Sequence, residues 1–195
     1  MQYQFETLTV AIPTWNRRER IKPTLESICI QPEAGLINII ILDNGSDDKY
    51  ESSLEVLKKS KIPYRYLRNQ TNVGMCANIL RCVEESVTDW VWILGDDDPV
   101  TPDALSRLIP AINKSKGVDI ICFSEAVKCN RLELGEGSIK GFIEFLETPK
   151  SFEAVVGISE NIFRRSVFLK YISYGYHYGT TMFPHVVVAF AMMDG

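Results

Sequence analysis

Three consecutive aspartates, Asp96, Asp97 and Asp98, follow directly on the apolar run 90–94 and are the residues of this chain best suited to chemistry. Adjacent carboxylates repel one another, so their charge must be taken up by a cation or by a strongly hydrated turn. Mg²⁺ and Mn²⁺ prefer carboxylate oxygens and share their remaining positions with water and phosphate. The triplet alone therefore indicates either a divalent metal site or an acidic turn before the next helix.

Alternating strands and helices must position these aspartates. Apolar runs predict strands over residues 8–12, 37–42, 64–67, 90–94 and 119–123. Helical spacing of apolar residues predicts helices around 21–29, 54–57 and 74–85, after 102 and from 184 onward. In the less regular second half, 134–138 is predicted as a loop and 141–146 as a short helix. This alternation is typical of a mostly parallel α/β sheet with helices on its faces.

Polar clusters follow three of the predicted strands. Residues 13–16 follow the first strand, residues 43–46 the second, and the aspartates the strand at 90–94. Because ligands of parallel α/β sheets bind at the carboxyl ends of the strands, we expect the three clusters to form one site. The chain contains neither a GxxxxGK[ST] nor a GxGxxG phosphate loop, and this favours a metal at the aspartates as the partner of a diphosphate.

Composition indicates an ordinary globular domain. The chain has 195 residues, 46% of them hydrophobic, which is enough for one substantial core. A net charge of -4 gives no basic footprint for nucleic acid. The five cysteines are odd in number and show no CxxC spacing, so we expect free thiols in a reducing compartment, the cytoplasm by default. No apolar run has the length of a membrane span.

Four segments in this order resemble a family 2 glycosyltransferase of the GT-A fold, a Rossmann-like nucleotide-binding architecture. They read VAIPTWNR at 10–17, ILDNGSDD at 41–48, Asn72-Val73-Gly74 with Asn78, and WILGDDD at 92–98. The spacing of Asn72, Gly74 and Asn78 with the Gly-Asp-Asp-Asp ending most resembles the abequosyltransferase-like branch, which builds bacterial surface polysaccharides. The resemblance implies a single domain over 1–195, with a nucleotide-sugar-binding half at 1–125 and an acceptor-side half at 126–195 that is truncated at its C-terminus.

The resemblance also implies the residues that hold the donor. Asp97 and Asp98 would bind Mn²⁺ or Mg²⁺ bridging the diphosphate, and Trp15 would lie against the nucleobase unless it is an ordinary aromatic of the rim. Asn44 stands where the family often has aspartate. This substitution leaves the identity of the nucleobase open and admits cytosine. A purely structural role in the turn fits Asn44 equally. The expected donor-binding residues are Pro13, Thr14, Trp15, Asn16, Asp43, Asn44, Asn72, Gly74, Asn78 and Asp96.

The expected reaction is an inverting transfer to a hydroxyl of a saccharide or lipid-linked saccharide acceptor. It needs a base, but the acidic pair that the family usually carries after a segment like 161–165 is absent. His185 is the first candidate for the base and Glu160 the second. His185 fits equally well as a metal-side ligand or as a histidine at the start of a helix.

Two alternatives stay open at this point. A catalytically silent or truncated sugar-nucleotide-binding domain would keep the metal and nucleotide motifs without a base. A sugar-phosphate nucleotidyltransferase would share the α/β layout, but its Gly-rich, Arg-bearing opening after the first strand is missing. Elements beyond residue 195 are expected to bring the domain to the inner face of the membrane as a peripheral protein. The sequence does not predict an oligomeric state.

Overall fold

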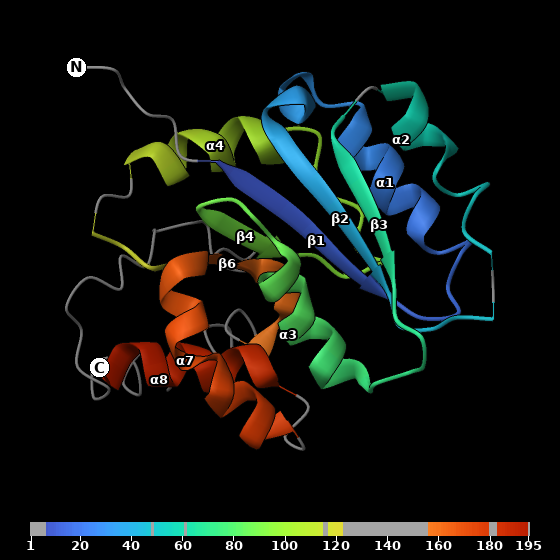
Figure 1. The fold of residues 1–195 in the computed structure, drawn as a ribbon. Helices are drawn as coiled ribbons and strands as arrows, with labels where there is room; N and C mark the ends of the chain where they lie inside the picture. The colour runs from blue at the N-terminus through green and yellow to red at the C-terminus, as the bar shows by residue number, and fades with distance from the viewer. Residues whose placement is uncertain are drawn as a thin grey trace.

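The computed structural model describes residues 7–47, 49–60, 62–114, 117–122, 156–179 and 183–194. Strands and helices alternate along this part of the chain, as the apolar periodicity predicts (Figure 1). In chain order the elements, with η for 3-10 helices, are β1 Leu8–Thr14, α1 Ile21–Cys29, η1 Pro32–Leu36, β2 Ile37–Asp43, α2 Glu55–Ser60, β3 Tyr64–Arg68, α3 Met75–Glu85, β4 Trp90–Ile93, α4 Ala104–Lys114, β5 Ile120–Cys122, η2 Ile158–Glu160, β6 Asn161–Arg164, α7 Arg165–His177 and α8 Pro184–Asp194.

The described strands form one sheet in the order β3-β2-β1-β4-β6-β5. Strands β1 to β4 are parallel, and β6 runs antiparallel to both β4 and β5. The expected mostly parallel α/β sheet is therefore confirmed. The strand order reverses at β1, which has β2 on one side and β4 on the other. Such a switch point is where α/β proteins bind their ligands, at the carboxyl ends of the strands.

Helices cover both faces of this sheet (Figure 1). On one face, α1, α2 and α4 pack against inward side chains such as Val10 and Ile12 of β1. On the other face, α3, α7 and α8 pack against Ala11 of the same strand. Because successive side chains of a strand point to opposite faces, a strand covered on both faces must be apolar throughout. This requirement explains the continuous apolar runs that predicted the strands.

Two details of the sheet differ from the sequence expectations. Strand β1 continues through Pro13 to Thr14, although the sequence predicted that it ends before the proline. Proline has no N–H to donate, but β4 ends opposite Ala11, so no residue of β4 needs a hydrogen bond from position 13. Residues 161–164 form strand β6, for which the apolar pattern predicted no secondary structure. The helix expected from Pro184 is confirmed as α8.

The predicted loop at 134–138, the predicted helix at 141–146 and the boundary between residues 125 and 126 lie outside the described residues. Within the described ranges, no helix combines the length and the apolar character needed to cross a membrane.

Candidate functional site

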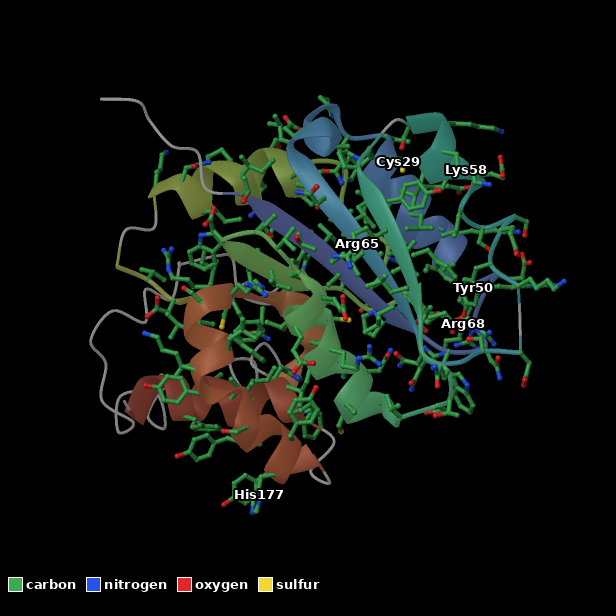
Figure 2. All side chains as sticks on the ribbon, viewed as in Figure 1. Cys29, Tyr50, Lys58, Arg65, Arg68 and His177 are labelled. Atoms are coloured by element: carbon green, nitrogen blue, oxygen red, sulfur yellow. The ribbon has the colours of Figure 1, made fainter. Side chains whose placement is uncertain are left out.

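The three polar clusters meet at the switch point, as predicted. Thr14 Oγ1 donates to Asp96 Oδ2 at 2.7 Å, which joins the end of β1 to the loop after β4. Asn44 N donates to Thr14 O at 2.9 Å, which joins the end of β2 to the same strand. Tyr50 and Arg68 lie close to this end of the sheet (Figure 2). This edge of the sheet, called the rim below, therefore brings together residues from three separate parts of the sequence.

The aspartate loop, residues Gly95 to Asp98, sends its carboxylates to three different places. Asp96 is buried and accepts from Arg17 Nη1 at 3.0 Å in addition to Thr14. Asp97 Oδ2 lies on the surface, 3.3 Å from Arg17 Nη1 and 3.4 Å from Arg20 Nη1. The loop is a turn, closed by Asp98 N donating to Gly95 O at 3.3 Å. The turn, rather than strand alternation, separates the three carboxylates.

Arginines supply the positive charge that the aspartate triplet requires. Burial raises the pKa of the Asp96 carboxyl, while the hydrogen bonds from Thr14 and Arg17 act in the opposite direction. The same hydrogen bond to Asp96 raises the pKa of Arg17. Neither Arg17 nor Arg20 is among the site residues that the sequence predicts. Their position within five residues after Trp15, in the segment that follows the first strand, was the available signal.

Asp98 is held by a residue far away in the sequence. Ser159 Oγ, from η2, donates to Asp98 Oδ2 and accepts from Gly95 N at 2.8 Å. A methyl group on Gly95 would collide with the Asp98 carboxylate and lie 3.3 Å from Ser159 Oγ, so an alanine at this position would force the Asp98 side chain to shift. The sequence contains no signal for Ser159, because the contact spans more than sixty residues.

The donor set of the aspartate loop fits a divalent cation only in part. No group of three His, Cys, Asp or Glu side chains converges anywhere in the described ranges. Asp97, whose side chain is 44% exposed, and the exposed Asp98 present hard carboxylate oxygens at the surface. Mg²⁺ in particular is usually held by one or two carboxylates together with substrate phosphate and water. Asp97 and Asp98 fit such a site as its two carboxylate ligands, and phosphate oxygens and water would have to complete it.

Asp43 is engaged entirely within the protein. Its side chain is fully buried, and its carboxylate accepts from Ser46 N at 2.9 Å, from Ser46 Oγ and from Tyr66 Oη at 2.6 Å. Arg68 Nε lies 3.2 Å from Asp43 Oδ2. Burial, and then the bond to Asp43, raise the pKa of the Tyr66 phenol. A direct donor contact by Asp43 stays a prediction, and it would require one of these partners to be exchanged.

Asn44 belongs to a cluster of hydrogen-bonded amides, the asparagine cluster of Asn44, Asn69, Asn72 and Asn78. Its Oδ1 accepts from Asn69 Nδ2 at 2.9 Å and from Val73 N at 3.0 Å, while its Nδ2 donates to Asn72 Oδ1 at 2.8 Å. Asn72 Oδ1 also accepts from Gly74 N. An aspartate at position 44 would place two acceptors against each other. This arrangement explains asparagine at position 44 without reference to the nucleobase.

Asn78 lies in the buried part of the same cluster. Its Nδ2 donates to Leu42 O at 3.0 Å, and its Oδ1 accepts from Asn69 Nδ2 at 2.9 Å. Asn72 and Gly74, in contrast, are exposed on the loop that the cluster supports. Of the four predicted donor residues in this region, the structure thus places Asn72 and Gly74 at the surface and Asn44 and Asn78 beneath it. The donor contacts themselves stay predictions.

Trp15 and Asn16 form the outer edge of the rim. Trp15 is 50% exposed, which leaves an aromatic face available for stacking. Asn16 has a φ of 51°, a left-handed conformation that asparagine tolerates. Its backbone N donates to Ser46 Oγ at 2.8 Å, and its Oδ1 accepts from Asp47 N at 2.8 Å. Asn16 therefore fixes the loop after β1 to the loop after β2.

The two candidate bases occupy different environments. His185, at the start of α8, is 2% exposed and has its Nε2 3.0 Å from Val156 O. Glu160 ends η2 and directly follows Ser159, the residue that contacts the aspartate loop. An acceptor hydroxyl could reach His185 only after a local opening, whereas Glu160 is half-buried beside the loop. Neither assignment as base is tested by this geometry.

A sequence model described as glycosyl transferase family 2 matches residues 9–172. The chain belongs to this family. The family expected from the four motifs is thereby confirmed. Among curated relatives of this glycosyltransferase domain, abequosyltransferase RfbV of Salmonella typhimurium is 32% identical over 129 residues, which are 65% of this chain and 38% of the relative. A Campylobacter jejuni GalNAc(5)-diNAcBac-PP-undecaprenol beta-1,3-glucosyltransferase is 31% identical over 108 residues, 55% of this chain and 35% of the relative.

Solved glycosyltransferase structures share the fold at low sequence identity. S. aureus TarS 1-349 in complex with UDP superposes with a TM-score of 0.62 at 16% identity, covering 84% of this chain and 48% of that one. Mannosyltransferase PcManGT from Pyrobaculum calidifontis, in complex with GDP-Man and Mn²⁺, has a TM-score of 0.61 at 15% identity, covering 86% and 47%. The GT-A fold is therefore confirmed. The chain spans less than half the length of each of these four proteins.

Proposed function

We propose that this domain transfers a sugar, with inversion, from a nucleotide-diphosphate sugar to a hydroxyl acceptor. The observation that carries the proposal is the pair of surface carboxylates, Asp97 and Asp98, at the switch point of a parallel sheet, on the same rim as the exposed Trp15. Donor phosphates bind at such an edge, and carboxylates there provide the oxygen ligands that a bridging cation requires. Membership of glycosyl transferase family 2 supports this assignment.

In the proposed reaction the acceptor hydroxyl attacks the anomeric carbon in line, and the nucleoside diphosphate leaves. Asp97 and Asp98 would hold Mn²⁺ or Mg²⁺, which neutralises the charge developing on the leaving diphosphate. Trp15 would hold the nucleobase of the donor by stacking against it, and Asn72 and Gly74 would line the donor-binding edge of the sheet. The acceptor proton goes to a catalytic base, for which His185 and Glu160 are the candidates.

The acceptor is proposed to be a saccharide or lipid-linked saccharide of bacterial O-antigen or capsule synthesis. Support comes from the printed names of the relatives, an abequosyltransferase and a glucosyltransferase whose name includes an undecaprenol-linked saccharide. Such an acceptor places the work of the full protein in the cytoplasm, at the inner face of the membrane. The transferred sugar is proposed to be a hexose or deoxyhexose.

Thermal stabilisation by a panel of UDP-, dTDP-, GDP- and CDP-sugars, each with and without Mn²⁺, tests donor binding. We expect one nucleotide class to raise the melting temperature in a Mn²⁺-dependent manner. Asp97→Ala and Asp98→Ala should each abolish that dependence. If no sugar nucleotide stabilises the protein, or if both variants behave as the wild type does, the proposed site is wrong.

A silent sugar-nucleotide-binding domain is the second candidate, favoured by the burial of His185. Release of the nucleoside diphosphate from the donor, measured on a longer natural chain, separates the two. Binding without release or transfer would select the silent domain. Family membership removes the reason to keep the nucleotidyltransferase alternative.

A further inference from the structure

We propose that Arg17 and Arg20 are ligands of the donor diphosphate, and that they occupy Asp97 until the donor arrives. This inference rests on the proposed function, because it takes Asp97 as a ligand of the bridging cation. It assigns a binding role to two residues that lie outside the predicted site, and it gives Asp97 two successive partners.

The starting geometry is a carboxylate shared by two guanidinium groups. Arg17 Nη1 lies 3.3 Å and Arg20 Nη1 3.4 Å from Asp97 Oδ2. Both arginines come from the turn before α1, where Arg20 N donates to Arg17 O at 2.9 Å, so they present neighbouring side chains to the aspartate loop. Their side chains are 46% and 64% exposed. Long, exposed side chains of this kind can turn to a new partner without disturbing the core.

The diphosphate would lie within reach of the same two groups. A cation bound to Asp97 and to a phosphate oxygen makes two metal–oxygen bonds of about 2 Å each, so that phosphate oxygen lies within about 4 Å of the carboxylate. Arg17 and Arg20 already touch that carboxylate oxygen. Guanidinium groups bind phosphate through two parallel N–H donors, which is stronger than a single contact with an exposed carboxylate.

Buried Asp96 is the residue that would hold Arg17 in place during the exchange. Its carboxylate accepts from Arg17 Nη1 at 3.0 Å and from Thr14 Oγ1 at 2.7 Å, and its backbone O accepts from Thr24 Oγ1 at 3.1 Å. Tyr50 Oη, which also lies 2.9 Å from Thr14 Oγ1, accepts from Arg17 N at 3.0 Å. Asp96 would therefore act by positioning Arg17. This role differs from the direct donor contact that the sequence analysis expects of Asp96.

Charge balance requires the arginines in both states. Without a donor, they offset the repulsion among the carboxylates of Asp96, Asp97 and Asp98. With the donor, a divalent cation is matched by the negative charges of the two phosphate groups, and the carboxylates still need positive partners. Arg17 contacts both Asp96 and Asp97, so it can keep its bond to Asp96 while Arg20 turns from Asp97 to the phosphates.

The test compares Mn²⁺ binding and diphosphate binding in Arg20→Gln, with Arg18→Gln as the matched control. Arg18 is 47% exposed on the same turn but pairs with Glu19 instead of the aspartate loop. Loss of a competing guanidinium should tighten binding of Mn²⁺ alone by about twofold to fivefold, measured by electron paramagnetic resonance of free Mn²⁺. The nucleoside diphosphate that best stabilises the wild type should bind about tenfold more weakly in calorimetry with Mn²⁺ present, whereas its nucleoside should be unaffected.

Opposite changes in the two affinities are the signature of the proposal. A residue with a merely structural role would weaken both, and that result would overturn the inference, as would equal effects of Arg20→Gln and Arg18→Gln. If the wild type binds a nucleoside diphosphate and Arg20→Gln binds it equally well, the inference fails while the proposed function stands. If the wild type binds no nucleoside diphosphate, both fail. Because Arg17 also holds the buried Asp96, Arg17→Lys is used in place of Arg17→Gln and should show the same signs to a smaller extent.

Discussion

The asparagine cluster and the aspartate loop are two parts of one rim that use their polar side chains in opposite ways. Asn44, Asn69 and Asn78 are buried, and their amides bond to one another and to the backbone. In the aspartate loop, Asp97 lies at the surface and is paired only with exposed arginines among the contacts described. A saturated buried network fixes the shape of a site, whereas surface charges with exchangeable partners can bind ligands. We therefore expect substitutions in the asparagine cluster to lower the stability of the fold, and substitutions in the aspartate loop to weaken ligand binding.

The largest effect on stability is expected from Asn69→Ala, at the centre of the asparagine cluster. Asn69 Nδ2 donates to both Asn44 and Asn78, and Arg81 Nη1 donates to Asn69 Oδ1. Removing the amide takes away all three of these hydrogen bonds and leaves the buried Asn78 Oδ1 without its donor, at a cost of about 3 kcal/mol in the free energy of unfolding. Urea denaturation measures it. Asn113→Ala, which removes the bond from Asn113 Nδ2 to Ile109 O on α4, should cost less than about 1 kcal/mol.

Gly45→Ala tests how tightly the asparagine cluster packs the neighbouring loops. Gly45 has a φ of 74°, and an added Cβ would lie 2.8 Å from the backbone carbon of Thr71. Strain and collision together should lower the free energy of unfolding by about 2 kcal/mol. Gly117→Ala is the matched control, because its φ is 75° but its Cβ would meet nothing within 4 Å. Equal losses in the two variants would show that the loops are not in tight contact.

Asn44→Asp separates a structural role of this residue from base recognition. The carboxylate cannot donate to Asn72 Oδ1, so the free energy of unfolding should fall by about 1 to 2 kcal/mol. The preferred nucleotide in the thermal-stabilisation panel should stay the same. A change of preference between UDP-, dTDP-, GDP- and CDP-sugars without loss of stability would instead show that Asn44 reads the base.

Asp97→Ala should have the smallest effect on stability and a large one on binding. Because the side chain is 44% exposed and, within the described residues, pairs only with exposed arginines, the free energy of unfolding should change by no more than about 0.5 kcal/mol. Mn²⁺-dependent stabilisation by the preferred sugar nucleotide should disappear. Asp103→Ala, at an exposed acid 3.7 Å from Arg107, should leave that stabilisation intact. A marked loss of stability in Asp97→Ala would remove the contrast between the two regions.

The sequence predicted the location of the site better than the roles of its residues. Local periodicity defined the strands, and polar clusters at strand ends placed Thr14, Asn44 and Asp96 on one rim, which their hydrogen bonds confirm. The sequence did not predict that Asp43 and Asn78 are buried with their polar atoms engaged. It also did not predict that Asp96 is buried and bonded to Thr14 and Arg17, while a donor contact by Asp96 stays a prediction. Each of these differences concerns the partner of a polar side chain.

By itself, the sequence determined the α/β layout, the family and the edge of the sheet that carries the polar residues, because apolar spacing and turn residues act over a few neighbouring positions. Only the tertiary structure decided which polar groups face inward and which remain available. Ser159 against Gly95, Arg17 against Asp96 and Asn69 against Asn44 are contacts between distant parts of the chain. Such contacts depend on the strand order and on helix packing, which bring together residues whose local sequences carry no sign of each other.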